Sequence, residues 1–291
     1  MRGRLERFFL AQWYRRKLTW LLPLAPLGWL VEAAAARRLR HFSAHRETPP
    51  VPLLVVGNIS VGGTGKTPVV IALVQAFAAR GLKVVVISRG YGSAAPRYPF
   101  VVTAKSRVVE SGDEPLLIAR RTGVPVVIDA DRKNALERAL DFQPDVIISD
   151  DGLQHYALPR TTEVVVLDGE RGIGNGHCLP AGPLRESTDR LATVDVVLIN
   201  GGDFTWPGAT RIALSVGAAI NVATGATRAL TDFAAETTFD AVAAIGNPGR
   251  FFATLERAGL RIRRHTFADH HVFSAADIAW DGDVLMTEKD A

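Results

Sequence analysis

The sequence has a single cysteine, Cys178, among its 291 residues, so no intramolecular disulfide can form. A chain without disulfides is typical of a reducing compartment. Long apolar segments are scarce as well. The uncharged N-terminal stretch at residues 18–31 has only fourteen residues and contains Pro23 and Pro26. A membrane-spanning helix needs about 20 apolar residues, so this stretch is too short to cross a bilayer. The sequence also lacks internal repeats and low-complexity tracts.

The charges are unevenly distributed along the chain. Residues 1–46 contain ten Lys or Arg and two Glu, a net charge of +8, so residues 47–291 carry −4 of the total of +4. A basic groove for nucleic acid is therefore not expected in the body of the protein, and we predict neither a nucleic-acid nor a protein partner. With 47% hydrophobic and 22% charged residues, the chain can bury a core and suits one or two domains.

The most informative stretch is residues 53–74, LLVVGNISVGGTGKTPVVIALV. An apolar run leads into a glycine-rich turn that ends in Gly65, Lys66 and Thr67, and a helical pattern follows. This order is typical of a phosphate-binding loop, in which backbone N–H groups point at phosphate oxygens, Lys66 reaches the β- and γ-phosphates, and the Thr67 hydroxyl binds Mg²⁺. The residues that we expect to bind nucleotide are Ser60, Val61, Gly62, Gly63, Thr64, Gly65, Lys66 and Thr67.

The loop departs from the strict motif at two positions. Ser60 stands where the motif has its first glycine, and Val61 replaces the lysine that marks the related loops of dimerising ATPases. A glycine-rich turn that binds nothing is the alternative interpretation. Because the strand, loop and helix patterns follow one another in the order of a phosphate-binding loop, we favour a nucleotide site.

Strand and helix patterns alternate after residue 50. Apolar runs predict strands at residues 83–88, 124–129, 145–149, 163–167 and 194–199, and helices at 115–121 and 134–140. This alternation predicts an α/β, P-loop NTPase-like fold, with a mostly parallel sheet and helices on both faces. Ligands of such folds bind beyond the carboxyl ends of the strands, where most of the polar clusters of this sequence fall.

We divide the chain into three parts: a basic N-terminal segment at 1–46, a P-loop core domain at 47–208, and linker strands with a smaller C-terminal α/β domain at 209–291. A strand at 241–245 would begin the βα unit of the smaller domain. The chain ends shortly after a strand-like run at 284–286, where an α/β unit would continue into a helix. We therefore expect the natural protein to be longer.

The N-terminal segment combines its positive charge with apolar residues at near-helical spacing, namely Leu5, Phe8, Phe9, Trp13 and Trp20. A basic amphipathic helix is typical of segments that lie in a membrane interface, where each basic residue contributes about 1 kcal/mol near an anionic surface. The alternatives are a cleaved signal peptide, because the run of alanines at 33–36 resembles a cleavage site, and a helix that packs on the protein's own body. Membrane contact and packing are compatible if they use different faces of the helix.

Three carboxylates have the surroundings that phosphate chemistry needs. Asp150 and Asp151 follow a predicted strand, where a P-loop protein places a Mg²⁺ ligand, although Asp-Asp-Gly also suits a solvated turn. Asp113 precedes Glu-Pro, so it is either a helix N-cap or a carboxylate that accepts the proton of an acceptor hydroxyl.

Basic side chains near turns are a further group. Arg89, Arg132 and Arg185 stand beside turn residues and are suited to bidentate phosphate binding. The alternative for each is a surface ion pair, which contributes about 0–1 kcal/mol. His270 and His271 are adjacent, and such pairs are more often structural than catalytic.

Seven motifs follow one another over nearly the whole chain: SVGGTGKTP, SRGYG, GDEP, DDGLQH, GNGHCLPAGPLRE, FADHH and TEKDA. In these motifs the chain resembles the tetraacyldisaccharide 4'-kinases of lipid A biosynthesis. The resemblance implies a lipid kinase that uses ATP and Mg²⁺ to phosphorylate the 4'-hydroxyl of a tetraacyldisaccharide 1-phosphate, giving lipid IVA. It also implies a position at the cytoplasmic face of the bacterial inner membrane, where the basic N-terminal segment would hold the enzyme.

The resemblance assigns roles to individual residues. It implies that Asp113 is the catalytic base, paired with His270 or, in a different alignment, with His271, and that Lys66 stabilises the transferring phosphate. The implied Mg²⁺ ligands are Thr67, Asp150, Asp151 and Gln154. The implied acceptor-binding residues are Arg89, Arg132, Arg185 and Glu186.

A membrane-associated nucleotide-switch ATPase of the deviant P-loop type is the alternative function. It would share the loop, the aspartates and an amphipathic membrane helix. Val61 argues against it, because the signature lysine of those ATPases is missing, and the run at 174–186 has no role in a switch.

Overall fold

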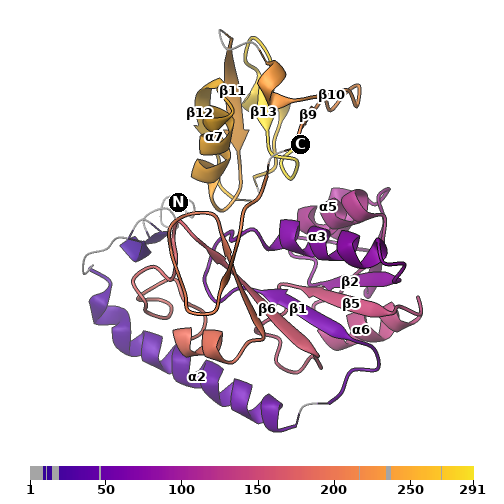
Figure 1. The fold of residues 1–291 in the computed structure, drawn as a ribbon, viewed down its shortest axis with the longest axis vertical. Helices are drawn as coiled ribbons and strands as arrows, with labels where there is room; N and C mark the ends of the chain where they lie inside the picture. The colour runs from indigo at the N-terminus through magenta and orange to yellow at the C-terminus, as the bar shows by residue number, and fades with distance from the viewer. Residues whose placement is uncertain are drawn as a thin grey trace. The chain divides into compact units, whose positions relative to one another are not determined.

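The computed structural model describes residues 9–10, 12–14, 20–45, 47–215, 217–233, 237–269 and 271–291. The chain divides into two compact units, Met1–Ala213 and Leu214–Ala291 (Figure 1). The predicted positions at Leu5, Phe8 and His270 lie outside the described residues.

The first unit is built on an eight-stranded sheet with the order β3-β4-β2-β5-β1-β6-β7-β8. Its strands are β1 (Leu53–Gly57), β2 (Val84–Ser88), β3 (Phe100–Val102), β4 (Val126–Ile128), β5 (Val146–Asp150), β6 (Thr162–Asp168), β7 (Val196–Asn200) and β8 (Thr210–Ile212). Every pair is parallel except β3 with β4. The expected mostly parallel sheet is thereby confirmed.

Alternate side chains of the strands point to opposite faces of the sheet, and different helices cover the two faces. The helices α3 (Lys66–Ala78) and α5 (Asp113–Thr122) pack on one face, through residues such as Val70 and Ile118. The helix α6 (Arg132–Leu140) packs on the other face through Ala135, Leu136 and Ala139 (Figure 1). Since both faces are covered, the strands are continuous apolar runs, as expected of a buried parallel sheet. Two further short helices of this unit are α4 (Val108–Ser111) and η2 (Thr188–Ala192).

The N-terminal region packs on this body. After the short η1 (Leu22–Leu24), the helix α2 (Ala25–Ala44) buries Ala25 and Gly28. A Cβ at Gly28 would lie 2.9 Å from the Cys178 carbonyl oxygen, so only glycine permits this close approach. Trp13 is also buried, and its Nε1–H donates to the Pro180 carbonyl at 3.0 Å. Among the described residues, no helix is both long enough and apolar enough to span a membrane.

The second unit has a parallel sheet of three strands in the order β12-β11-β13. Its elements are β11 (Thr238–Ala243), β12 (Arg261–Thr266), β13 (Val284–Met286), α7 (Pro248–Arg257), η3 (Leu230–Asp232), η4 (Ala275–Ile278) and a hairpin of β9 (Ala219–Ile220) and β10 (Thr227–Arg228). Ala241, Phe252 and Leu255 belong to its core. The first unit extends to Ala213, beyond the expected residue 208, because β8 pairs with β7 in the large sheet.

Candidate active site

The glycine-rich loop connects β1 to α3, as the sequence predicts. Gly62 has a φ of +104° and Gly65, which caps α3, has a φ of +88°, a region that residues with a Cβ rarely adopt. Two buried asparagines hold the loop through its carbonyl oxygens: Asn200 Nδ2 donates to Thr64 at 3.1 Å, and Asn58 Nδ2 donates to Gly62 at 3.4 Å. The loop therefore has a fixed shape at the N-terminus of a helix, where backbone geometry favours anions.

A second chain segment lies directly against this loop. Residues 183–185 run antiparallel to residues 59–61, with Val61 N–H donating to the Pro183 carbonyl at 2.8 Å and Arg185 N–H donating to the Ile59 carbonyl at 2.7 Å. This short pairing brings the Arg185 side chain beside the phosphate loop although the two are far apart in the sequence.

Three charged side chains meet at the end of β5. Lys66 Nζ lies 3.3 Å from Asp151 Oδ1, and Arg185 Nη1 lies 3.6 Å from Asp151 Oδ2. Burial acts to raise the pKa of Asp151, but the charges of Lys66 and Arg185 outweigh it and lower that pKa. Asp151 is thus ionised and holds both cations next to the loop.

Asp150 is in a different environment from Asp151. It is the last residue of β5, is 1% exposed, and its Oδ1 has no hydrogen-bond partner among the described residues. Burial, with the charges of Glu114 and Asp151 adding to it, raises the pKa of Asp150 to about 7. A buried carboxylate oxygen without a protein partner fits a Mg²⁺ ion, which prefers oxygen ligands.

The donor set for such an ion is small. The described residues contain no cluster of three or more His, Cys, Asp or Glu around one metal position. Thr67, the second residue of α3, offers a hydroxyl beside the same loop. Phosphate oxygens and water would have to supply the remaining ligands, as is usual for Mg²⁺ in nucleotide sites.

The predicted arginines gather near this edge of the sheet. Arg132 is 3% exposed, and its guanidinium donates to the carbonyl oxygens of Asp129 at 3.1 Å and Asp150 at 3.2 Å. Burial lowers the pKa of Arg132 to about 10, and the nearby charge of Arg89 contributes to the shift. Arg89, Arg132 and Arg185 therefore all lie near the end of β5 or the loop.

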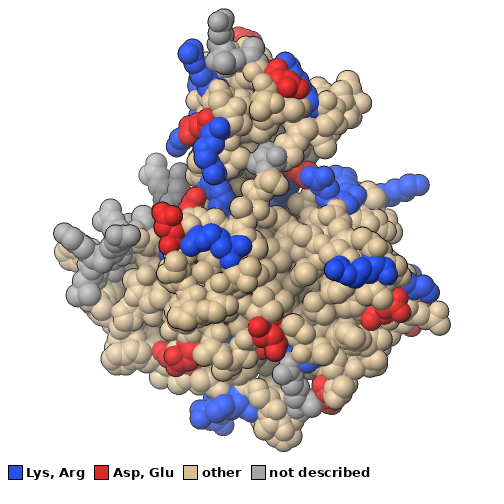
Figure 2. All heavy atoms as spheres, in the orientation of Figure 1, with Lys and Arg blue, Asp and Glu red and all other residues tan. Residues whose placement is uncertain are grey.

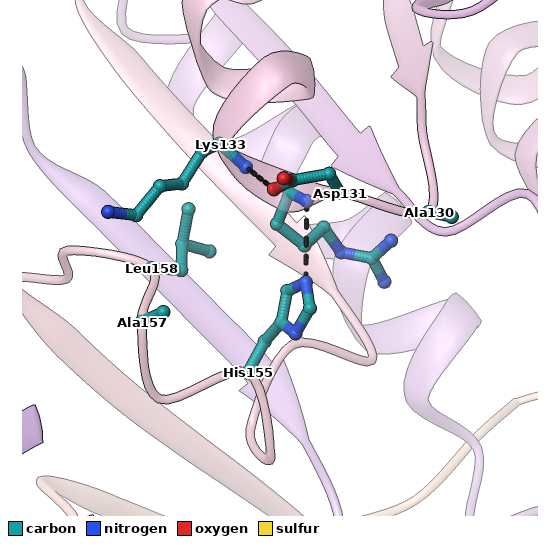
Figure 3. A pocket seen from close by; sticks show the side chains of 7 residues that line it. Ala130, Asp131, Lys133, His155, Ala157 and Leu158 are labelled. Carbon is teal, nitrogen blue, oxygen red and sulfur yellow. Dashed lines mark hydrogen bonds between the residues drawn. The ribbon is translucent and has the colours of Figure 1, made fainter.

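A cavity of about 480 Å³ lies at the N-terminus of α6 (Figure 3). Its lining includes Lys133 and His155, whose Nε2 accepts a hydrogen bond from the Arg132 backbone N–H at 3.3 Å. Burial, followed by the charge of Arg132, lowers the pKa of His155, so its ring is neutral near pH 7. Asp131 also lines the cavity and caps α6 by accepting from Lys133 N–H at 2.9 Å. The cavity therefore has charges of both signs.

Gln154 and Glu186 form part of a hydrogen-bond network. Gln154 Nε2 donates to the Asn58 carbonyl at 2.9 Å and to Glu186 Oε1 at 2.6 Å. Its Oε1 accepts from Arg185 Nη1 at 3.4 Å. In this arrangement Gln154 connects the phosphate loop to Glu186 and Arg185, and its role as a Mg²⁺ ligand stays a prediction.

Asp113 is the first residue of α5, and Gly112, with a φ of +78°, occupies the N-cap position. Asp113 Oδ1 accepts from the Glu114 backbone N–H at 3.0 Å. The charge of Glu114 contributes to the raised pKa of Asp150, so the start of α5 is close to the end of β5. His271 belongs to the second unit, where its Nε2 lies 3.4 Å from Asp277 Oδ2.

Sequence reasoning missed three residues that shape the loop. Asn58 and Asn200 hold its carbonyl oxygens, and the Tyr14 hydroxyl donates to the Val61 carbonyl at 3.2 Å. The position of Asn200 at the carboxyl end of β7 is a signal that could have found it. No local pattern indicates the contact of Tyr14, because it depends on how the N-terminal region packs.

Comparisons with known proteins place this geometry in a family. The family model described as tetraacyldisaccharide-1-P 4'-kinase matches residues 19–291. The chain belongs to this family. It is 54% identical to the tetraacyldisaccharide 4'-kinase of Alcanivorax borkumensis, over 99% of this chain and 89% of that protein. It is 50% identical to the tetraacyldisaccharide 4'-kinase of Azotobacter vinelandii, over 97% and 86% of the two chains.

A solved structure of the same family has a similar fold. The crystal structure of LpxK from Aquifex aeolicus in complex with ATP superposes with a TM-score of 0.70 at 26% sequence identity, over 94% of this chain and 89% of that chain. The family resemblance inferred from the seven motifs is thereby confirmed, together with the P-loop NTPase-like fold.

Proposed function

We propose that this chain transfers the γ-phosphate of ATP to the 4'-hydroxyl of a tetraacyldisaccharide 1-phosphate, giving lipid IVA. The match of residues 19–291 to the 4'-kinase family is the observation that carries this choice of reaction. The ATP complex of the Aquifex aeolicus relative supports ATP as the phosphate donor. The ordered loop at the start of α3, with its ion pair of Lys66 and Asp151, provides the matching anion site in this chain.

On the nucleotide side, backbone N–H groups of residues 60–67 bind the phosphates, and Lys66 contacts the β- and γ-phosphate oxygens. Mg²⁺ in such a site neutralises charge on the phosphates. Thr67 and Asp150 are the residues that would hold the ion, and the unpartnered oxygen of Asp150 supports this role. Asp151 orients Lys66 and Arg185 through its two carboxylate oxygens.

On the acceptor side, Asp113 accepts the proton of the sugar hydroxyl, as the family resemblance implies. Arg89, Arg132 and Arg185 offset the negative charge that develops during transfer. Asp113 is the first residue of α5 and stands next to Glu114, whose charge contributes to the raised pKa of Asp150, and this position supports its role.

The N-terminal region keeps the enzyme at the surface where an acylated acceptor resides. Large apolar side chains just before and within the first turns of α2 are exposed: Trp20 by 90%, Leu27 by 49%, Trp29 by 62% and Leu30 by 66%. We call these four residues the apolar patch. Such a patch, followed by basic residues along α2, suits a membrane interface. The reaction would take place at the cytoplasmic face of the inner membrane, where ATP is available.

The face drawn in Figure 2 gives no support to a nucleic-acid substrate. On the face drawn in Figure 2, the Lys and Arg side chains of the described residues are interspersed with Asp and Glu. A nucleic-acid groove would need a basic stripe.

The test is incubation of the protein with γ-labelled ATP and a lipid extract from a Gram-negative bacterium. Label in a lipid product is the expected result, and a Lys66→Ala variant should label the lipid roughly 10²–10³-fold more slowly. Slow release of labelled phosphate without any labelled lipid would instead favour a nucleotide-switch ATPase and overturn the proposal.

A further inference from the structure

A chain of buried charged and polar groups leads from β6 to the phosphate loop. Glu163, on β6, accepts from Arg160 Nη1 at 2.8 Å and from Arg190 Nη2 at 2.5 Å. Arg190 Nε also lies 3.3 Å from Glu186 Oε2. The side chains of these four residues are 8% exposed or less, and their two positive and two negative charges balance. We call Arg160, Glu163, Glu186 and Arg190 the buried ion cluster.

Tyr156 is the polar neighbour that completes this cluster. Its hydroxyl donates to Glu186 Oε2 at 2.6 Å. Burial, followed by the hydrogen bond and charge of Glu186, raises the pKa of the tyrosine, so the hydroxyl keeps its proton and remains a donor. Its ring also lies 5.6 Å from the Arg38 guanidinium of α2. The two oxygens of Glu186 therefore have distinct partners, with Tyr156 and Arg190 at Oε2 and Gln154 at Oε1.

Glu186 and the Asn58 carbonyl together determine what Gln154 presents to the site, because Gln154 Nε2 donates to both. A backbone carbonyl only accepts hydrogen bonds, so Gln154 must turn its NH₂ group toward Asn58 and, with it, toward Glu186 Oε1. The amide oxygen of Gln154 then faces Arg185 Nη1, which is 3.4 Å away. Arg185 in turn contacts Asp151, the partner of Lys66. The Glu186–Gln154 and Gln154–Arg185 contacts are hydrogen bonds, and the contacts of Asp151 with Arg185 and Lys66 are ion pairs.

We infer that Tyr156 and Arg190 are positioning residues that orient Glu186 and, through it, Gln154 and Arg185 at the site of phosphate transfer. The inference rests on the proposed function. A buried ion pair is often no more stabilising than apolar residues of the same size, so stability alone does not explain the buried ion cluster. The inference gives the cluster a role in positioning the site. Displacing a catalytic cation by about 1 Å can cost up to roughly 100-fold in rate.

Tyr156→Phe is the sharpest variant, because it removes one hydroxyl and keeps the ring beside Arg38. We expect kcat to fall at least about 10-fold, with KM for ATP changed less than about 2-fold. The matched control is Tyr98→Phe, which also removes a bonded hydroxyl, since Tyr98 is exposed and its hydroxyl bonds to Ser93 Oγ at 2.8 Å. Arg190→Lys keeps the charge but loses the planar fork, and it should lower kcat similarly. An unchanged kcat for either variant would show that the substituted residue, Tyr156 or Arg190, does not position the site.

A double-mutant cycle separates positioning from packing. Tyr156 acts through Glu186, so Tyr156→Phe should change kcat less than about 2-fold in a Glu186→Gln background. Single-turnover conditions, with enzyme in excess over labelled ATP, allow slow variants to be timed. Rates are compared per folded molecule, at a temperature well below each Tm.

The outcomes of the cycle are distinguishable. If Tyr156→Phe lowers kcat equally in the wild-type and Glu186→Gln backgrounds, the inference is overturned and a structural role remains. The same conclusion holds if the loss of kcat disappears when only folded molecules are counted. A wild-type protein that phosphorylates no disaccharide would overturn the proposed function itself. A normal kcat for Tyr156→Phe, with an active wild type, would remove only the inference.

Discussion

Lys66 and Asp151 form an ion pair of 3.3 Å that joins the start of α3 to the turn after β5. Asp151 reaches this position with a φ of +48°, which is unusual for a residue with a side chain. Its other oxygen lies 3.6 Å from Arg185, which the pairing of residues 183–185 with the loop brings into place. Elements from three parts of the sequence thus converge on one carboxylate.

Lys66→Ala should lower kcat for phosphate transfer by roughly 10²–10³-fold, because it removes a charge aimed at the transferring phosphate. The loss of stability should be small, about 1 kcal/mol or less, since the Asp151 side chain is 37% exposed and such pairs contribute little. Steady-state kinetics and thermal unfolding check both values. Lys83→Ala, at the opposite end of the parallel strands, is the control. A kcat within 2-fold of the wild type would exclude the proposed role of Lys66.

Asp113→Ala should lower kcat by roughly 10²–10⁴-fold with little change in ATP affinity, because a general base acts on the acceptor and not on the nucleotide. Gly112 makes no side-chain capping bond, and Asp113 Oδ1 accepts from the Glu114 N–H at the start of α5, so the substitution should also lower stability by about 1 kcal/mol. The measurements are kcat with saturating acceptor and the Kd of an ATP analogue. Asp141→Ala, at an exposed position after α6, is the control. An unchanged kcat would remove Asp113 from the mechanism.

Cys178 should be nearly inert in the folded protein. Burial, with the charges of Glu32 and Glu186 adding to it, raises the pKa of its thiol to about 11. The thiolate is the reactive form, so at pH 8 its fraction is more than about 100-fold below that of an ordinary cysteine, and the rate should rise about tenfold per pH unit toward pH 10. Alkylation by iodoacetamide, followed by intact mass, measures this directly because the chain has no other cysteine. Similar rates for native and guanidinium-unfolded protein would contradict the burial of Cys178.

The sequence predicts the central sheet well for a physical reason. Strands such as β2 and β5 are buried on both faces, so they are continuous β-branched runs that local patterns reveal. The antiparallel edge strand β3 was not predicted, because its apolar run has only three residues. The short β8 was expected only as part of the linker strands after residue 208, and not as a strand of the large sheet. The extension of the first unit to Ala213 follows from the same short strand.

The residues of the candidate site also differ in how far local sequence patterns predict them. The loop at residues 60–67 is local, so its glycines and Lys66 are recognisable from spacing alone. The contacts of Arg185 and Glu186 depend instead on long-range pairing with Ile59 and with the residues after β5. No local pattern encodes these contacts. The turn context indicated Arg185 as a candidate beforehand, and only the family resemblance indicated Glu186.

Membrane attachment should depend on the apolar patch. Replacing Trp29 and Leu30 by Gln should weaken binding to anionic vesicles at least about 10-fold, because each apolar side chain contributes about 1.5–3 kcal/mol when fully buried. Point substitutions are preferable to deletion of residues 1–31, since deletion would also remove Trp13 and Tyr14, which contact the body. Vesicle sedimentation is the measurement.

The matched control for this experiment replaces Ile220 and Val222, two exposed apolar residues of the second unit, by Gln. The control should bind vesicles like the wild type. Equal binding of the Trp29 and Leu30 variant would show that the membrane contact lies elsewhere.

The central claim is that a triphosphate held at residues 60–67 delivers its γ-phosphate to one sugar hydroxyl. The most direct measurement is incubation of purified tetraacyldisaccharide 1-phosphate with ATP and Mg²⁺, followed by phosphorus NMR of the lipid product. The account predicts one new phosphate monoester per acceptor, at the 4' position. An unmodified acceptor, or a phosphate at another position, would contradict it.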